Sequence, residues 1–176
     1  SYNCGAYIAE TIESVLSQTA PVHEVIVIDD GSRDNTREIV APFVRDGRVR
    51  YLWQENRGQV RSRNRGIGEA KGDLVAFLDA DDLWRPTKIE KQLPHFDNPA
   101  TGVSYTDVEV ITPDATAVID FRRKNDFEQM RRGRVLREIF RYNFVPFSSI
   151  VVRKSCLDTV GPFNESLSMG DDWDIL

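Results

Sequence analysis

The sequence predicts an α/β fold in which a mostly parallel sheet is flanked by helices. Between residues 5 and 93, segments with helical periodicity alternate with extended apolar segments. The extended segments are rich in β-branched residues, as is typical of strands that are buried on both faces. Alternation at this spacing favours parallel strands joined by crossover helices. The remaining residues contain several shorter extended segments, for which we expect a small antiparallel extension.

Length, net charge and cysteine spacing argue against several classes of function for this sequence. The 176 residues suit a single domain, and the formal net charge of −5 argues against non-specific nucleic-acid binding. No stretch approaches the ~20 apolar residues of a transmembrane helix. Cys4 and Cys156 form neither a CxxC pair nor a zinc-binding spacing, so we expect two free thiols, with a disulfide left open.

The first three elements show clear periodicities. Residues 5–18 carry apolar side chains every three or four positions, which predicts a helix. Residues 25–28 form an alternating Val and Ile run that ends in acids and glycine, which predicts a buried strand and a turn. A second helix is expected to begin near Asp34, with Gly47 after its end.

The next elements continue the alternation. Residues 48–55 alternate as a strand, and residues 57–72 are expected to form a helix. Gly66 inside that helix costs about 1 kcal/mol relative to Ala and indicates close packing. Residues 73–82 are the third predicted strand, and Pro86 suits the first turn of a helix that continues through TKIEKQL.

The second half is expected to be richer in strands. Residues 102–111 and 117–121 are predicted strands around the turn TPDA. Residues 127–142 are expected to form a helix with a basic face, and residues 147–155 a strand that runs into a helix.

Acidic residues follow two of the predicted strands. Asp29 and Asp30 end one strand, and Asp79, Asp81 and Asp82 end another. Ligands of parallel α/β sheets bind outside the carboxyl ends of the strands. Both clusters are therefore expected along one edge of the sheet, where a ligand would bind.

The Asp79–Asp82 cluster is a candidate metal site. Two carboxylates separated by one residue on an extended backbone can approach one hard cation, such as Mg²⁺ or Mn²⁺. A solvated acidic turn is the alternative, and the position at a strand end favours the metal. An EF-hand loop starting at Asp79 is excluded, because its sixth position is Trp84 and not the required glycine.

Asp30 is a candidate ligand for a base or a ribose. Gly31 allows the chain to turn and a ligand to approach. Ser32 or Asp34 could cap the following helix, so capping and binding are compatible. A Gly-rich phosphate loop is not expected, because the only GxG segment, residues 66–68, lies inside a predicted helix.

The basic helix and the final segment offer further candidates. Arg57 and Arg61 are interpreted as a solvated face, whereas Arg63 and Asn64 are expected near the packed side. The segment GDDWDI could supply a carboxylate that acts as a general base. A favourable charge at a helix start is the alternative for these acids.

Together these segments resemble family 2 of the glycosyltransferases, which has the GT-A fold. The matching segments, in order along nearly the whole chain, are SYN, AETIESVLSQT, EVIVIDDGSRDNT, ENRGQVRSRNRGIGEAKGDLVAFLDADD and GPFNESLSMGDDWDIL. The resemblance implies transfer of a sugar, with inversion, from a nucleotide-diphospho-sugar to an acceptor hydroxyl. A UDP-sugar is the default donor that it implies.

The resemblance also implies roles for single residues in the donor site. Tyr2 would lie against the donor base, and Asp30 would hydrogen-bond that base. Arg63, within Ser62-Arg63-Asn64, would help to hold the nucleotide. Asp79 would lie near the ribose.

Two further aspartates would carry the chemistry. By resemblance, Asp81 would bind the Mn²⁺ or Mg²⁺ ion that bridges the diphosphate, and Asp172 would be the general base. The family has Glu before this base, whereas the present sequence has Asp171. This departure leaves the base, Asp172, in place.

The resemblance implies a single GT-A domain fragment that lacks the first strand and the C-terminal part of the family. Residues 1–98 would form the nucleotide-sugar-binding half, and residues 99–176 the acceptor-side half. The expected partners are the donor and a carbohydrate or lipid-linked carbohydrate acceptor, without nucleic acid. The expected location is the cytoplasm, with peripheral association at the inner face of the cytoplasmic membrane left open.

Two other functions stay open. A sugar-nucleotide pyrophosphorylase would share a related sheet and metal carboxylates. It would, however, need a Gly-rich loop with Arg or Lys where this sequence has SYNCGAY. The other alternative is a non-catalytic module that binds nucleotide sugars.

Overall fold

The computed structural model describes residues 1–111, 118–120, 133–139 and 143–167. The helices in these ranges are α1 (Ile8–Leu16), α2 (Thr36–Arg45), α3 (Gln59–Glu69), α4 (Lys88–Gln92), α6 (Leu136–Ile139) and α7 (Lys154–Val160), with 3-10 turns η1 (Leu93–Asp97) and η2 (Phe147–Ser149). The strands are β1 (Val25–Asp29), β2 (Val49–Trp53), β3 (Leu74–Ala76), β4 (Val103–Ser104), β5 (Glu109–Ile111), β6 (Val118–Asp120) and β7 (Val151–Arg153).

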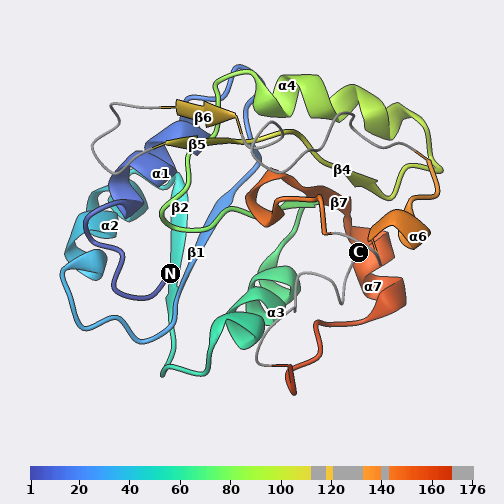
Figure 1. Cartoon of the computed structure of the whole chain (residues 1–176). Coiled ribbons are helices and arrows are strands. Elements are labelled where there is room, and N and C mark those ends of the chain that lie inside the picture. The colour runs from blue at the N-terminus through green and yellow to red at the C-terminus, as the bar shows by residue number, and fades with distance from the viewer. Residues whose placement is uncertain (112–117, 121–132, 140–142, 168–176) are drawn as a thin grey trace.

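β1 and β2 form a parallel pair with helices on both faces (Figure 1). Val27 of β1 belongs to a buried apolar cluster with residues of α1 and α2. The next residue, Ile28, points the other way, because side chains alternate along a strand. Its Cγ1 would lie 3.6 Å from a Cβ at Gly66 of α3. The expected close approach at Gly66 is therefore an ordinary van der Waals contact between helix and strand.

A second sheet has the order β3-β7-β4 and is antiparallel. β3 was expected to run from residue 73 to residue 82, and it is much shorter. Ala76 is the last residue that pairs with β7, and the Phe77 N–H makes only a long bond of 3.4 Å to the Ile150 carbonyl. The chain leaves the sheet before its acidic residues, so these lie in a turn beyond the strand.

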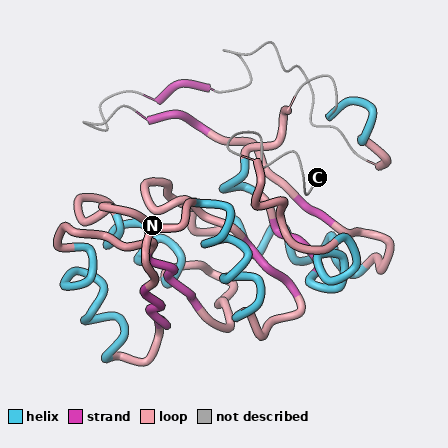
Figure 2. The backbone as a smooth tube through the Cα atoms, turned by 90° about the horizontal axis from the view of Figure 1, so that it is seen from below, coloured by secondary structure: helices cyan, strands magenta, loops and turns pink. Residues whose placement is uncertain are grey.

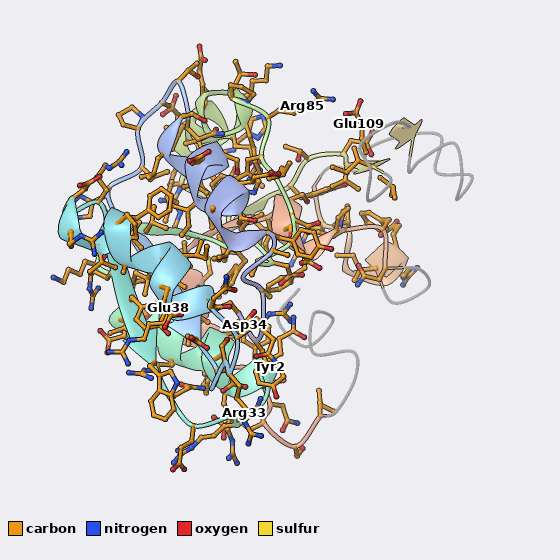
Figure 3. The ribbon with its side chains drawn as sticks, turned by 90° about the vertical axis from the view of Figure 1, so that its left-hand side faces the viewer. Tyr2, Arg33, Asp34, Glu38, Arg85 and Glu109 are labelled. Atoms are coloured by element: carbon orange, nitrogen blue, oxygen red, sulfur yellow. The ribbon has the colours of Figure 1, made fainter. Side chains whose placement is uncertain are left out.

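β5 and β6 form an antiparallel hairpin that projects from the body of the molecule (Figure 2). The expected strand over residues 102–111 is divided into β4 and β5, which belong to different sheets. The TPDA turn between β5 and β6 lies outside the described residues. An ion pair between Arg85 and Glu109 joins the hairpin to the body (Figure 3).

Within the described residues, the core consists of three apolar clusters. One lies between α1, α2 and the first sheet, and one between α1, α4 and β7. The largest contains Phe77, Phe147 and Phe163, whose ring centroids are 4.9–6.1 Å apart. Each fully buried side chain of this size contributes roughly 1.5–3 kcal/mol to folding. The second and third clusters flank the chain segment that follows β3 and so fix its course.

Candidate active site

The acidic segment after β3 forms a tight turn, here called the carboxylate turn (Asp79–Asp82). The Asp82 N–H donates to the Asp79 carbonyl at 3.1 Å and closes the turn. Thr11 of α1 donates through its hydroxyl to the Ala80 carbonyl at 3.0 Å. Asp81 and Asp82 are exposed, and among the described residues no side chain binds their carboxylates. The turn therefore presents two open carboxylates on a fixed backbone.

Asp79 and Arg63, both predicted site residues, are in direct contact. Arg63 Nη2 lies 3.4 Å from Asp79 Oδ1, and the Arg63 side chain is only 11% exposed. The pKa of Asp79 is raised by burial first, and also by the neighbouring charges of Asp82 and Asp81, while Arg63 acts in the opposite direction. Arg63 thus partly compensates a carboxylate whose surroundings disfavour its charge.

Asp30 is buried and its carboxylate is already engaged within the protein. Asp30 Oδ1 accepts hydrogen bonds from Gln54 Nε2 at 2.6 Å and from the Arg57 N–H at 2.9 Å. Asp30 Oδ2 accepts one from the Gly58 N–H at 2.8 Å. Burial raises the pKa of Asp30, but these hydrogen bonds together outweigh it and lower the pKa. Asp30 therefore shapes the loop before α3, and this loop contact was not foreseen.

The neighbouring Asp29 has a structural role. It is fully buried, accepts the Tyr51 hydroxyl, and accepts the Ser32 N–H at 2.8 Å. Burial, followed by the bond to Asp29, raises the pKa of Tyr51. The buried pair fixes the end of β1, from which Asp30 emerges.

Tyr2 lies beside the end of β1. The Ser1 ammonium donates to the Ile28 carbonyl at 2.7 Å, and the Asp30 N–H donates to the Ser1 carbonyl at 2.9 Å. Tyr2 is 48% exposed and lies near Arg33 and Asp34 (Figure 3). Its ring is therefore available to a ligand at the same edge as Asp30.

Asp34 precedes the cap position of α2, which is Asn35 and makes no side-chain capping hydrogen bond, so Asp34 is not the helix cap that was expected. Its Oδ1 accepts the Thr36 N–H at 3.1 Å, at the first residue of α2. Its Oδ2 accepts the Gly5 N–H at 2.9 Å. The carboxylate thus also ties the loop before α1 to the start of α2, which orients the segment that carries Tyr2.

α3 links the two parts of the site. Gly58, immediately before α3, binds Asp30, and Arg63, within α3, binds Asp79. Asp172 lies outside the described residues, so its predicted role as a base stays a prediction. Within the described ranges, no group of three or more His, Cys, Asp or Glu side chains is arranged to hold a metal ion.

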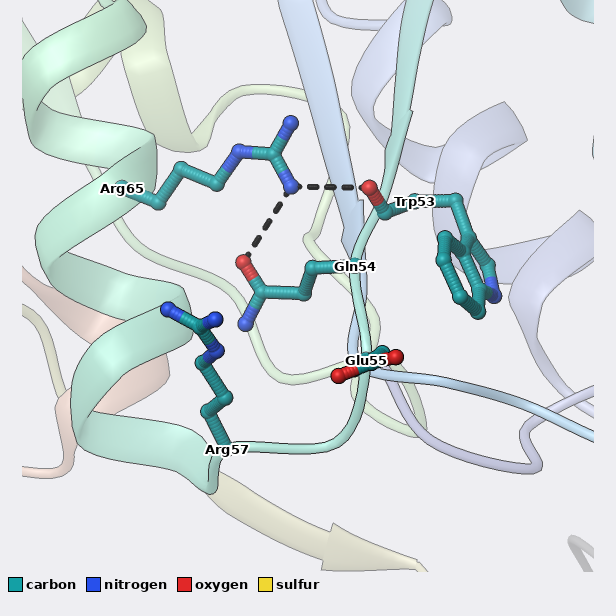
Figure 4. Close-up of a pocket in the computed structure, with 5 residues that line it drawn as sticks. All are labelled: Trp53, Gln54, Glu55, Arg57 and Arg65. Atoms are coloured by element: carbon teal, nitrogen blue, oxygen red, sulfur yellow. Dashed lines mark hydrogen bonds between the residues drawn. The ribbon is translucent and has the colours of Figure 1, made fainter.

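An open hollow of about 460 Å³ lies between the end of β2, the loop that follows it and α3 (Figure 4). It is lined by Trp53, Gln54, Glu55, Arg57 and Arg65. Arg65 Nη1 donates to the Trp53 carbonyl at 2.9 Å and to Gln54 Oε1 at 3.2 Å. Gln54 also donates to Asp30, so Arg65 supports the position of Asp30 through Gln54.

Two arginines, one just before α3 and one within it, are exposed, in agreement with the expectation of a solvated face. Arg57 and Arg61 are both exposed. Arg61 Nε lies 2.9 Å from Glu165 Oε2, and Asn64 on the packed side donates to the Phe163 carbonyl at 3.0 Å. Arg63 and Asn64 both contact the body of the protein, as predicted.

Comparison with known proteins identifies the family. Residues 1–155 match the family model described as Glycosyl transferase family 2. The chain belongs to glycosyl transferase family 2. The teichuronic acid biosynthesis glycosyltransferase TuaG of Bacillus subtilis is 38% identical over 69% of this chain and 49% of its own length. The succinoglycan biosynthesis protein ExoO of Rhizobium meliloti is 30% identical over 100% of this chain and 52% of its own length. The chain thus spans about half the length of these family 2 relatives.

Solved structures of glycosyltransferases share the fold. TarS of S. aureus, in complex with UDP, superposes on 98% of this chain with a TM-score of 0.76 and 23% identity, over 51% of TarS. Mannosyltransferase PcManGT from Pyrobaculum calidifontis, in complex with GDP-Man and Mn²⁺, superposes on 99% of this chain, with a TM-score of 0.73, 22% identity and 48% of its own chain covered. At these identities the likeness establishes the GT-A fold, and the α/β class predicted from the sequence is confirmed.

The structure also shows site residues that the sequence did not reveal. Gln54, Phe147 and Ser148 contact Asp30, Arg63 and Asp79, respectively. Gln54 directly follows a strand, which is a weak signal for a residue at the ligand-binding edge. Phe147 and Ser148 carry no local signal, because their partners are distant in sequence.

Proposed function

We propose that this domain transfers a sugar from a nucleotide-diphospho-sugar, with a UDP-sugar as first candidate, to an acceptor hydroxyl with inversion. Membership of family 2 supports glycosyl transfer in general. The observation that carries the proposal is the fixed carboxylate turn, where Arg63 binds Asp79 and the neighbouring Asp81 stays open. Solved neighbours bound to UDP, to UDP-GlcNAc and to GDP-Man with Mn²⁺ support a nucleotide-sugar donor.

The residues of the turn fit a divalent cation. Asp81 offers an exposed carboxylate, and Mg²⁺ or Mn²⁺ is commonly held by one or two carboxylates together with substrate phosphate oxygens. The shortage of further acidic or imidazole ligands among the described residues is compatible with this arrangement, because a donor diphosphate supplies oxygens. A bound cation would act as a Lewis acid and neutralise charge on the leaving diphosphate.

The nucleotide would lie between Tyr2 and the Asp30 loop. The exposed ring of Tyr2 can pack against a base, and Asp30 Oδ2 keeps acceptor capacity, since a carboxylate oxygen has two lone pairs. We assign Asp79 to the ribose, with Arg63 holding the Asp79 carboxylate in place.

The reaction is a direct displacement. As the acceptor oxygen attacks the anomeric carbon, its proton passes to Asp172, and the bond to the diphosphate oxygen breaks on the opposite face. The configuration at the anomeric carbon is therefore inverted. General-base assistance of this kind contributes roughly 10²- to 10⁴-fold to a rate.

The acceptor is proposed to be a carbohydrate or a lipid-linked carbohydrate. The names of TuaG and ExoO, which refer to polysaccharide biosynthesis, support this class. In the ranges that the structure describes, no helix is both long and apolar enough to span a membrane. We propose a cytoplasmic location. If the acceptor is lipid-linked, we propose that the protein associates with the inner face of the cytoplasmic membrane.

The decisive experiment is a transfer assay on the complete protein with radiolabelled UDP-sugars and Mn²⁺. Asp172→Asn is expected to lower kcat by roughly 10² to 10⁴. Asp81→Ala is expected to abolish metal-dependent transfer, whereas Asp46→Ala, at an exposed position in a surface ion pair, serves as control. Metal-dependent transfer that survives in both site variants would refute the assignment. UDP binding without any transfer would favour the non-catalytic module.

A further inference from the structure

The turn η2 reaches the carboxylate turn from two directions. The Asp79 N–H donates to Ser148 Oγ at 3.1 Å. From the other side, the Arg63 guanidinium carbon lies 3.7 Å from the centroid of the Phe147 ring, and the same guanidinium pairs with Asp79. Two adjacent residues of η2 therefore hold the backbone of Asp79 and, through Arg63, its carboxylate.

Ser148 also holds Trp84, two residues after the carboxylate turn. Its carbonyl accepts Trp84 Nε1–H at 2.9 Å, and Trp84 is itself buried, at 8% exposed. Asp81 thus lies on a short segment that Ser148 fixes on both flanks. The Asp79 N–H binds the Ser148 hydroxyl, whereas Trp84 binds the Ser148 backbone carbonyl. Replacing the Ser148 side chain therefore removes only the hydrogen bond to Asp79.

η2 is well suited to act as a support. The Ile150 N–H donates to the Phe147 carbonyl at 3.2 Å, and the Ser149 hydroxyl donates to the Pro146 carbonyl at 2.7 Å. Phe147 is 8% exposed and packs against Phe77 at a centroid distance of 4.9 Å. A site held by such a packed and hydrogen-bonded shell is pre-organised, because little freedom is lost when the ligand binds.

We propose that Ser148 and Phe147 are positioning residues of the donor site. Ser148 sets the position of the carboxylate turn, and Phe147 supports the face of Arg63 so that its guanidinium stays against Asp79. This inference rests on the proposed function, in which Asp79 and Asp81 hold the donor. Neither positioning residue needs to touch the donor. η2 belongs to the half of the chain expected to serve the acceptor, so it ties the two halves together at the reacting centre.

Ser148→Ala tests the first contact, with Ser149→Ala as a matched control. Ser149 is the adjacent residue, is buried, and bonds through its hydroxyl to Pro146 and not to the turn. In Ser148→Ala, kcat/KM for the donor is expected to fall about fivefold, mainly through KM, as for one lost hydrogen bond. Ser149→Ala is expected to lower Tm without this change, and Ser148→Thr to restore the donor KM.

A second readout does not depend on activity. The Asp79 amide loses its acceptor in Ser148→Ala, so its hydrogen exchange, followed by NMR, is expected to accelerate there and not in Ser149→Ala. Equal exchange and equal donor KM in the two variants would overturn the role of Ser148 while leaving the proposed function intact. If the unaltered complete protein neither bound UDP nor transferred sugar, the proposed function would fall, and this role with it.

Phe147→Leu tests the support of Arg63. Leucine keeps an apolar side chain but removes the aromatic face on which the guanidinium lies. The donor KM is expected to rise several-fold, with kcat changed less. Phe96→Leu is the control, because Arg153 lies 5.4 Å from the Phe96 ring, away from the carboxylate turn. Equal effects of the two substitutions on donor KM would contradict the role of Phe147.

Discussion

At the scale of single residues, the carboxylates of Asp30 and Asp79 differ in how their charge is supported. Asp30 is surrounded by N–H donors and has a lowered pKa, whereas burial raises the pKa of Asp79. Asp30 therefore contributes to the stability of the loop before α3 without any ligand. Asp79 has a neighbouring guanidinium as its main compensation and is the better candidate to gain from a ligand.

Asp30→Asn is expected to destabilise the chain by about 1–3 kcal/mol at pH 7, because the amide presents N–H groups to the N–H donors around it. The folded pKa of Asp30 is lowered, so its contribution is present above the ordinary Asp pKa and is lost as the pH falls through the folded value. The difference in unfolding free energy between Asp30→Asn and the unaltered chain should therefore become smaller in acid. Urea unfolding at pH 7 and pH 3 measures it.

Asp46→Asn is the control for this experiment, because Asp46 is exposed and its ion pair with Arg48 is at the surface. A surface pair of this kind is worth at most about 1 kcal/mol. A gap for Asp30→Asn that stayed constant between the two pH values would contradict the assigned role of the charge.

Sequence patterns predicted where the site carboxylates would lie but not how they are held. Asp30 and Asp79 each follow a β-branched or apolar run, as predicted, but β1 and β3 belong to different sheets and not to one edge of a single sheet. The bond from Asp79 to Ser148 joins residues 69 positions apart in the chain. No local periodicity encodes such a contact, so the supports of the site became visible only in three dimensions.

At the scale of elements, the turn after β1 depends on a glycine. Gly31 has φ of +84°, and a Cβ there would lie 2.8 Å from the Asn56 backbone nitrogen. Gly31→Ala is therefore expected to destabilise the chain by at least about 2 kcal/mol, from left-handed backbone strain and the clash.

Gly68→Ala is expected to have the opposite effect on stability from Gly31→Ala. Gly68 lies in α3, and a Cβ there would meet nothing within 4 Å. The substitution is expected to stabilise the chain by up to about 1 kcal/mol, from the better helix propensity of Ala. Urea unfolding of both variants checks the pair. A tolerated Gly31→Ala would show that the turn can be built differently.

The α4 helix contains a buried cation. Lys88 is 7% exposed, its Nζ lies 4.1 Å from the centroid of the Trp84 ring, and it donates to Gln92 Oε1 at 2.7 Å. Burial lowers the pKa of Lys88 to about 7. Above that pH the unfolded chain binds a proton that the folded chain does not, so stability rises with pH until the ordinary Lys pKa is reached.

The expected gain from Lys88 between pH 7 and pH 9 is about 2 kcal/mol in unfolding free energy. Lys88→Met should remove this rise, whereas Lys91→Met, at an exposed position of the same helix, should retain it. Chemical denaturation at the two pH values measures the difference. The same slope in both variants would place the titrating group elsewhere.

The predicted helices and strands agree with the structure where they follow from a local apolar periodicity. The helices and strands from residue 8 to residue 69 match within a few residues, because apolar periodicity defines both their faces and their ends. The strand expected over residues 73–82 was too long, since β3 ends at Ala76, opposite Val151, the first residue of β7. Residues 102–111 were expected to form one strand, but they form β4 and β5, which belong to two different sheets.

At the scale of the whole molecule, the GT-A fold predicts coupling between ligand and stability. A ligand at 100 times its dissociation constant adds about 2.7 kcal/mol to folding stability. For a chain of this length, UDP with Mn²⁺ is expected to raise Tm by roughly 5–10 °C. Differential scanning calorimetry with UDP, Mn²⁺, both, or EDTA separates the contributions.

Asp81→Ala is expected to lose the part of this increase that requires Mn²⁺, while keeping the Tm of the free chain. A full increase with UDP in EDTA would contradict metal-assisted binding by Asp81. The assay also separates a protein that binds donors from one that does not, before any acceptor is known.

The pairing of β3 with β7 has a consequence for the order of folding. The β1–β2 pair joins segments about 24 residues apart, whereas β3 pairs with residues 151–153, which are about 75 positions later. Long-range pairings form slowly, and chains emerge from the ribosome N-terminus first. The β1–β2 pair can thus assemble early, while the Asp79 N–H lacks its acceptor until Ser148 has been synthesised. A nascent chain stalled before this point would lack one support of the carboxylate turn, so the proposed donor site would be completed late in synthesis.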